Sequence, residues 1–210
     1  MKNIRFSQYM VIPTFKIERE LSALGYNVIV GVDEAGCGSL AGPVVAGAVV
    51  LSLDSSIEGL CDSKLISASK REKVYFQICD KAVAWSAGQA SVEEIEKIGI
   101  RQSGLLAMKR AVGGISGVDF ILVDAWTIPE IDIPQRGVVK GDRYIKSIAA
   151  GSIVAKVTRD RIMCQYATIY PEYLFEIHMG YATQKHRDLL KQHGPCPIHR
   201  KTYSTIAQYY

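Results

Sequence analysis

The stretch around which this chain is organised is Gly31-Val-Asp-Glu-Ala-Gly-Cys-Gly-Ser-Leu-Ala-Gly-Pro-Val-Val45. A β-branched run leads into two adjacent carboxylates, Asp33 and Glu34, and a glycine-rich segment follows them. The pattern predicts a strand over 26–33, and the apolar run over 44–53 predicts a second strand that pairs with it as a hairpin. Glycines beside the acids let a ligand approach the backbone, although a tight turn that requires positive φ is an equally good interpretation.

Strands and helices alternate beyond this hairpin. Capping-box motifs at 69–72 and 91–94 predict two helix starts. The succession predicts an α/β fold with a mixed sheet, followed by about 45 residues that are richer in loops, aromatics and prolines. The other expected elements are strands over 82–87, 120–124 and 137–142 and helices over 15–24, 145–163 and 183–193.

The composition is that of a globular protein with a substantial apolar core. The chain has 210 residues, 48% of them hydrophobic and 22% charged, and its net charge of +4 hints only weakly at a polyanionic partner. Its five cysteines include no Cys-x-x-Cys pair, which argues against a disulfide framework. We find neither a signal peptide nor an apolar run long enough to cross a membrane, and we expect a cytoplasmic protein.

Three strand-like segments end in acids: Asp33-Glu34, Asp124 and Asp142. Ligand sites in α/β proteins tend to form at strand ends, and carboxylates gathered there repel one another unless a cation neutralises them. Hard divalent ions such as Mg²⁺ or Mn²⁺ suit such a cluster, and two of them can support phosphodiester cleavage. An acid after a strand, taken alone, is more often a turn former or helix cap than a metal ligand.

Further motifs give these acids a context. Taken with the opening stretch, they make the chain resemble ribonuclease HII, the prokaryotic type 2 ribonuclease H, from about Phe15 to Tyr203. The motifs that occur in the family's order are Asp62–Leu65, Ala107–Ala111, Val123-Asp124, Lys140–Asp142, Ala155–Asp160, Met179–Thr183 and His199-Arg200.

The resemblance implies a ribonuclease H-like fold, with a five-stranded mixed sheet flanked by helices and a C-terminal helical lobe. It divides the chain into an N-terminal segment with a short helix (1–25), a catalytic core (26–165) and a substrate-binding lobe (166–210). It also implies an endoribonuclease, acting as a monomer, that hydrolyses the RNA strand of RNA–DNA hybrids. The same enzyme would nick duplex DNA 5′ to an embedded ribonucleotide, leaving 3′-hydroxyl and 5′-phosphate ends.

The resemblance also assigns roles to individual residues. Tyr181 would stack on the sugar of the deoxynucleotide that follows the ribonucleotide, and Gly36-Cys37-Gly38 would contact the 2′-hydroxyl through the backbone. The acids that would bind Mg²⁺ or Mn²⁺, as two ions during catalysis, are Asp33, Glu34, Asp124 and Asp142. The residues expected close to phosphates are Lys64, Ser152, Lys156 and Arg159.

The sequence departs from the family pattern at three places. Cys37 stands where the family has arginine, Ser39 stands where it has proline, and Ala125-Trp126 replaces Gly-Asn after the third acid. The departures leave the metal-binding acids unaffected and concern the residues that would determine substrate affinity and recognition of the RNA–DNA junction.

Other functions remain possible on the residues alone. The acids permit a metal-dependent phosphohydrolase of another substrate class, and the basic segment 185–201 permits a non-catalytic nucleic-acid-binding module, or is simply a solvated helix face. A zinc site at His193, Cys196 and His199 lacks a clear fourth ligand. Cys37 as a nucleophile is disfavoured because the adjacent acids would raise its pKa.

Overall fold

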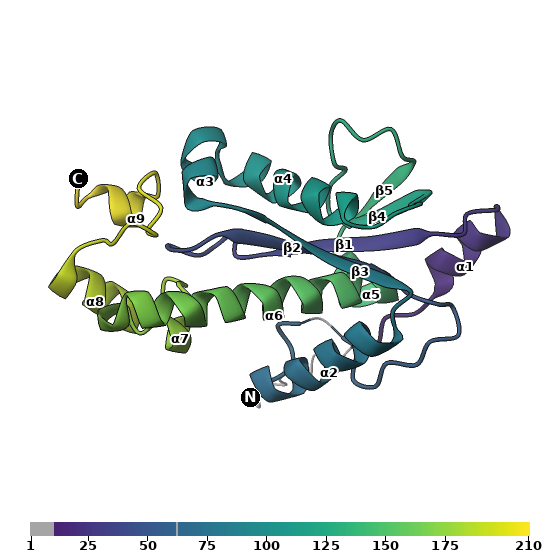
Figure 1. Cartoon of the computed structure of the whole chain (residues 1–210), viewed down its shortest axis with the longest axis horizontal. Helices are drawn as coiled ribbons and strands as arrows, with labels where there is room; N and C mark the ends of the chain where they lie inside the picture. Colours follow the sequence, from purple (N-terminus) through teal and green to yellow (C-terminus); the bar gives the residue numbers. More distant parts are fainter. Residues whose placement is uncertain (1–10, 62) are drawn as a thin grey trace, which may run out of the picture.

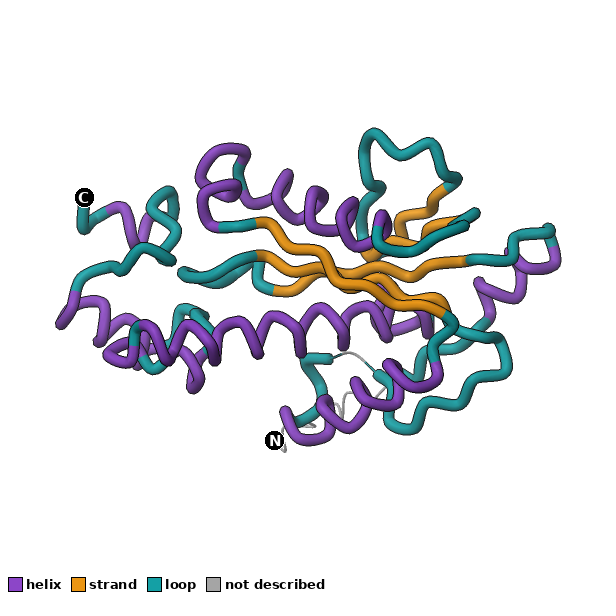
Figure 2. Tube along the Cα trace, viewed as in Figure 1, coloured by secondary structure: helices purple, strands orange, loops and turns teal. Residues whose placement is uncertain are grey.

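A mixed sheet forms the centre of the fold in the computed structural model, which describes residues 11–61 and 63–210 (Figures 1 and 2). Within these residues the sheet has five strands in the order β3-β2-β1-β4-β5. The strands are β1 (Ile29–Ala35), β2 (Val44–Val50), β3 (Ala84–Ala90), β4 (Phe120–Asp124) and β5 (Gln135–Val138). The helices are α1 (Lys16–Ala23), α2 (Ala68–Lys81), α3 (Val92–Ile98), α4 (Ile100–Gly113), α5 (Gly141–Tyr144), α6 (Lys146–Ile169), the 3₁₀-helix η1 (Pro171–Tyr173), α7 (Phe175–His178), α8 (Gln184–His193) and α9 (Ser204–Ala207).

The pairing of the strands confirms the expected hairpin and the mixed sheet. β1 and β2 are antiparallel and are joined by residues 36–43, and β3 continues the antiparallel half. β4 and β5 extend the sheet on the other side of β1 as parallel strands. β1 is therefore the central strand, and the acids of the opening stretch lie at its carboxyl end.

Helices cover both faces of the sheet (Figure 1). α3 and α4 lie on one face, where Met108 of α4 packs with Val32 of β1, and α6 lies on the other with α2 beside it. Two glycines allow α6 to approach closely. A Cβ added at Gly31 would collide with the backbone of Ser147, and one added at Gly47 would collide with that of Gly151.

Several element boundaries differ from those expected. The helix start predicted at Ser69 is wrong, because Ser67 is the N-cap of α2 and accepts a hydrogen bond from the Lys70 amide at 3.3 Å. The capping box at 91–94 is confirmed at the start of α3. β5 ends at Val138, so Asp142 does not end a strand. α6 continues to Ile169 and crosses the 165/166 boundary between core and lobe. That division stays a prediction, and residues 1–10 of its first part lie outside the described residues.

The C-terminal residues form a small cluster of short helices around their own apolar core. Phe175, Met163 and Leu190 belong to this core, together with Leu40 and Ala41 from the loop between β1 and β2. Isolated bridges pair Ser39 with Tyr181 and Ala41 with His199, so the lobe is joined directly to the glycine-rich loop. No helix in the described part of the chain is long and apolar enough to cross a membrane.

Candidate active site

Three carboxylates meet at the carboxyl ends of β1 and β4. The two strands are parallel, and their register aligns Val32 with Val123, so Asp33 and Asp124 follow at neighbouring positions. The charges of Glu34 and Asp124 both act on Asp33, which places all three carboxylates within electrostatic range. Strand order and register thus bring Asp124 together with acids that lie 90 and 91 residues earlier in the sequence.

The fourth acid reaches this edge from a helical turn. Lys140 has a left-handed φ of 59°, and α5 begins directly after it. The Gly141 amide donates to Asp124 Oδ1 at 2.7 Å, which fixes α5 against the third acid. Asp142 is buried, and its Oδ2 lies 3.8 Å from Lys64 Nζ. The strand expected over 137–142 lies instead at 135–138, so its extension to Asp142 is wrong, although the turn still brings Asp142 to the same edge.

Burial and mutual repulsion disfavour negative charge on the central acids. The pKa of Asp33 is raised well above its ordinary value, first by burial and then by the charges of Glu34 and Asp124. Burial is also the main cause of the raised pKa of Glu34, and Asp124 adds to it. The positive charge of Lys64 acts in the opposite direction on both groups. Burial and repulsion thus act against the ionised form of these acids, and the charge of Lys64 acts in its favour.

The chemistry of this cluster fits a divalent cation. Asp33 Oδ1 accepts a hydrogen bond from the Glu34 amide at 2.7 Å, whereas its buried Oδ2 has no hydrogen-bond partner in the described residues. A buried oxygen in that state is costly, and a hard cation with oxygen ligands would satisfy it and relieve the repulsion. Within residues 11–61 and 63–210, no three His, Cys, Asp or Glu side chains are already arranged as a ligand set.

Main-chain carbonyls of the loop between β1 and β2 accept hydrogen bonds from side chains of the C-terminal lobe. Tyr203 Oη donates to the Cys37 carbonyl at 2.8 Å, and Arg200 Nη1 donates to it at 3.1 Å. The amides of Cys37 and Gly38 have no acceptor among the main-chain bonds of the described residues. A Cβ added at the exposed Gly38 would meet open space. These two amides are therefore available to a ligand.

Cys37 itself is directed toward the acids. Its thiol donates to Glu34 Oε1 at 3.5 Å, and burial together with the Glu34 charge raises its pKa to about 12. A thiol with that pKa stays protonated near neutral pH, so the structure gives no support to a nucleophilic role for Cys37.

Two fully buried arginines lie behind the loop. Arg159 of α6 donates to the carbonyls of Pro43, Ala41 and Met179 at 2.9–3.0 Å. Arg200 donates to Gly42 at 2.8 Å as well as to Cys37. Arg159, expected close to phosphates, is thus fully buried and is occupied by main-chain carbonyls.

Sequence reasoning did not single out Arg200 or Tyr203 as site residues. His199-Arg200 is one of the family motifs, but Arg200 also belongs to the basic segment 185–201, whose charge suggests a surface position. A buried arginine without an acidic partner is rare, and its main-chain acceptors come from distant parts of the chain. Nothing local in the sequence indicates such a role.

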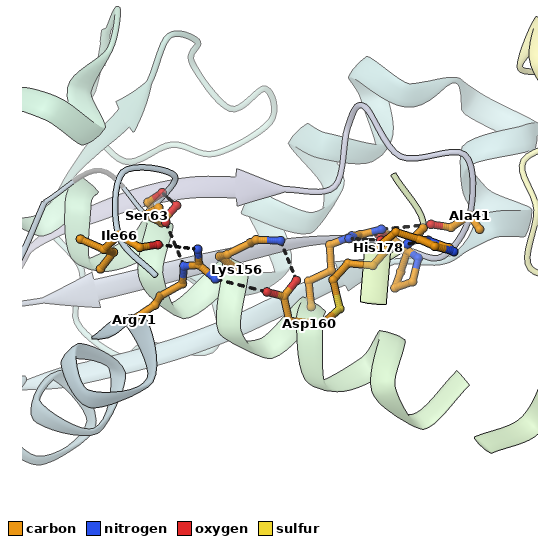
Figure 3. A network of polar contacts seen from close by, with 12 residues as sticks. Ala41, Ser63, Ile66, Arg71, Lys156, Asp160 and His178 are labelled. Atoms are coloured by element: carbon orange, nitrogen blue, oxygen red, sulfur yellow. Dashed lines mark hydrogen bonds and ion pairs between the residues drawn. The ribbon is translucent and has the colours of Figure 1, made fainter. Parts of the chain in front are cut away.

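The segment that carries Lys64 is held by a network of polar contacts (Figure 3). Arg71 of α2 donates to the carbonyls of Ser63 at 2.9 Å and Ile66 at 3.0 Å, on either side of Lys64. Its guanidinium also lies 3.5 Å from Asp160 of α6. The network fixes the backbone around a lysine whose side chain is 71% exposed. Asp62, which belongs to the same motif, lies outside the described residues.

The other expected substrate-binding residues lie on or beside α6. Ser152 is buried near Asp33, and its hydroxyl is 2.9 Å from that of Ser63. Lys156 forms an ion pair of 2.7 Å with Asp160, and its Nζ lies 4.8 Å from the ring centroid of Tyr181. The half-buried Tyr181 ring is thus flanked by a cation. These residues form a row from the acids to the lobe.

Three histidines form a buried chain beneath this row. His178 and His186 stack with ring centroids 4.2 Å apart, and His186 Nε2 lies 3.0 Å from His199 Nε2. The Cys196 amide donates to His199 Nδ1 at 2.9 Å, which leaves the proton of His199 on Nε2 to donate to His186. Burial lowers the pKa of His186 to about 4 and that of His199 to about 3. The rings are therefore neutral, and the nitrogens of His186 and His199 are engaged in hydrogen bonds. Since no group of three metal-ligating side chains occurs in the described part of the chain, the zinc interpretation gains no support.

Comparison with known proteins agrees with this architecture. The family model described as "Ribonuclease HII" matches residues 30–206. The chain is 48% identical over 193 residues to a ribonuclease HII of Bacillus velezensis, covering 91% of this chain and 75% of the relative. It is 44% identical over 190 residues to a ribonuclease HII of Caldicellulosiruptor saccharolyticus, covering 90% of this chain and 93% of the relative.

A solved structure has the same fold. The crystal structure of ribonuclease H2 from Pyrococcus horikoshii OT3 superposes with a TM-score of 0.68 at 25% identity, covering 87% of this chain and 97% of that one. This confirms the ribonuclease H-like fold expected from the sequence. Since the family model and both relatives extend over most of the chain, it belongs to the ribonuclease HII family.

Proposed function

We propose that this ribonuclease H-type nuclease uses Asp33, Glu34, Asp124 and Asp142 to hold divalent cations, Mg²⁺ or Mn²⁺, two of them during catalysis. The observation that carries the proposal is the buried, unpartnered Oδ2 of Asp33 among carboxylates that repel it. When bound, such ions supply an activated water and stabilise the leaving oxygen of a phosphodiester. The chain's own contribution is a rigid edge, formed by β1, β4 and α5, that fixes the four carboxylates.

The substrate is the RNA strand of an RNA–DNA hybrid, or DNA that contains single ribonucleotides. The amides of Cys37 and Gly38 have no acceptor in the described main chain and can donate to the 2′-hydroxyl, the group that distinguishes RNA from DNA. Arg200 and Tyr203 hold the Cys37 carbonyl and so keep this peptide in orientation. Cleavage 5′ to the ribonucleotide leaves a 3′-hydroxyl and a 5′-phosphate.

Residues along α6 contact the flanking strand. Tyr181 stacks on the sugar of the following deoxynucleotide, while Lys64 and Lys156 provide positive charge near phosphates. Ser152 lies at the start of this row, beside Asp33. Arg159 is fully engaged with carbonyls, so we assign it a positioning role under the loop in place of direct phosphate contact.

Cleavage-site mapping tests this function. A duplex with one embedded ribonucleotide and a long RNA–DNA hybrid are each incubated with Mg²⁺ or Mn²⁺, and p-nitrophenyl phosphate serves as a small phosphate ester. We expect a single nick 5′ to the ribonucleotide, cleavage of the hybrid, and no release of nitrophenol. Hydrolysis of the small ester without nicking would instead favour a phosphohydrolase of another substrate class.

We further propose that residues 26–165 form the catalytic core, that 166–210 form the substrate-binding lobe, and that the chain acts as a monomer. The separate apolar core of the lobe supports the division, although α6 crosses it. A cytoplasmic location is supported by the cysteines at 37, 61, 79, 164 and 196, none of which forms a disulfide within the described residues.

A further inference from the structure

An arginine and a tryptophan stack beside the acids without serving the fold in any evident way. The Arg101 guanidinium lies 4.2 Å from the ring centroid of Trp126, and the Trp126 side chain is 52% exposed. Arg101 forms no ion pair within the described residues. It lies in the first turn of α4, where a cation faces the positive end of the helix dipole, so the helix gains nothing from it.

The backbone that presents Trp126 is strained. Ala125 has a φ of 61°, and the Trp126 amide donates to the Asp124 carbonyl at 2.7 Å, which makes a three-residue turn of the uncommon kind with positive φ. Gly137 of β5 accommodates this turn, because a Cβ there would lie 2.9 Å from the Trp126 carbonyl. Persistent strain next to an acid cluster indicates that the direction of the Trp126 side chain matters for function.

A cavity of about 250 Å³ brings this pair together with one of the acids. Glu34, Cys37, Arg101 and Trp126 all line it, and Met108 contributes to the apolar lining. The space is slightly smaller than the pockets of about 300–1,000 Å³ that enclose drug-sized ligands. It therefore suits one sugar or base of a longer ligand that continues outside.

We propose that Arg101 and Trp126 form a nucleotide-binding subsite next to the cleavage site. Arg101 pairs with a backbone phosphate, for which a planar guanidinium is well suited, and the indole packs against the adjoining sugar or base. The subsite rests on the proposed function, since it positions the strand whose phosphodiester is cut at the four acids. It adds an affinity contact from α4, whereas Tyr181 lies beside Lys156 of α6 on the other face of the sheet. It also involves Trp126, where the sequence departs from the family pattern.

Tryptophan fluorescence tests the subsite without relying on turnover. The chain has two tryptophans, so Trp126 becomes the only reporter after Trp85→Phe. This protein is titrated in EDTA with a fluorophore-labelled duplex that contains one ribonucleotide, and binding is followed in parallel by anisotropy. We expect Trp126 emission to change and to saturate at the same duplex concentration as the anisotropy.

Variants identify the contacts. Arg101→Gln should weaken duplex binding about tenfold and reduce the slope of log affinity against log salt by about one phosphate contact. Trp126→Ala should weaken binding about tenfold, and Trp126→Phe should restore part of it. Arg161→Gln is the matched control, because Arg161 stacks at 4.5 Å on Tyr75, between α2 and α6, and should leave affinity unchanged.

The outcomes separate the subsite from the proposed function. A wild-type chain that fails to nick the ribonucleotide duplex with Mg²⁺ or Mn²⁺ would contradict the proposed function. A wild-type chain that nicks it, combined with silent Trp126 emission and unchanged affinity and salt slope in Arg101→Gln and Trp126→Ala, would overturn the subsite alone.

Discussion

At the scale of single residues, burial and mutual repulsion of the acids at the ends of β1 and β4 should lower the stability of the fold. Asp33→Asn keeps the shape of the side chain and removes one of the repelling charges. We expect a higher melting temperature in EDTA, and a cleavage rate with Mn²⁺ lower by on the order of a hundredfold or more. Thermal denaturation and single-turnover cleavage measure the two effects. A variant that loses activity and also melts lower in EDTA would show that Asp33 is mainly structural.

Cys37 gives a second prediction at this scale. With a pKa of about 12, its thiol is protonated between pH 7 and 9 and should react slowly with iodoacetamide. The exposed Cys164 is the internal control and should be alkylated first. Cys37→Ser should keep the cleavage rate within a few-fold of wild type. Peptide mapping after alkylation checks the order, and early modification of Cys37 would contradict the assignment.

At the scale of elements, two glycines of the loop between β1 and β2 look equivalent in the sequence but have different surroundings in the structure. Gly36 has a φ of 100°, and a Cβ there would collide with Arg159, whereas a Cβ at Gly38 would meet open space. Gly36→Ala should therefore cost about 1–3 kcal/mol of unfolding free energy. Gly38→Ala should fold normally and lose preference for ribonucleotide over all-DNA duplex. Urea denaturation measures the stability of the two variants, and competition binding measures their preference for ribonucleotide duplex. Equal unfolding free energies in both variants would refute this account.

Tyr203 provides the corresponding test of the residues behind the loop. Tyr203→Phe removes a hydroxyl that donates to the Cys37 carbonyl and accepts from Arg200 at 2.9 Å. The loss of about 0.5–1.5 kcal/mol should lower the melting temperature by a few degrees. Preference for ribonucleotide duplex should fall as the peptide loses its orientation. Tyr210→Phe, at the exposed end of the chain, serves as the control and should change neither quantity.

The helices and strands also show which parts of the fold can be predicted from the sequence. Ser91 caps α3 as predicted and β4 has the predicted bounds, because a capping box and a short apolar run are decided by adjacent residues. The segment before Asp142 was misassigned because its valines and glycines suit either a strand or a turn. The role of Arg200 was not predictable, since the Cys37 carbonyl that it binds is 163 residues away. The roles of the acids stay predictions that the variants above test.

At the scale of the whole molecule, stability should depend on pH through the buried histidines. The pKa values of His186 and His199 in the folded chain, about 4 and about 3, lie below the unfolded value near 6.5. The unfolded chain therefore binds more protons below that value, so the stabilisation present above pH 6.5 is lost as pH falls toward 4. We expect the melting temperature to decline across this window.

Two histidine variants test whether this decline in melting temperature originates in the C-terminal lobe. His186→Gln should melt lower at pH 7 and show a flatter dependence on pH between 4.5 and 6.5. His193→Gln, which alters an exposed histidine, should keep the wild-type dependence. Differential scanning fluorimetry at half-unit pH steps measures both. An unchanged slope in His186→Gln would mean that other groups control acid unfolding.

One continuous helix, α6, connects the acidic edge of the sheet with the lobe. α6 carries Ser152 beside the acids, Arg159 under the loop and Met163 in the lobe core. At 1.5 Å per residue, Ser152 and Met163 are about 16 Å apart along the axis, which equals roughly five nucleotide steps of a duplex strand. Because no joint interrupts the helix, the enzyme holds its two ends at a set spacing, and a bound duplex must conform to that spacing.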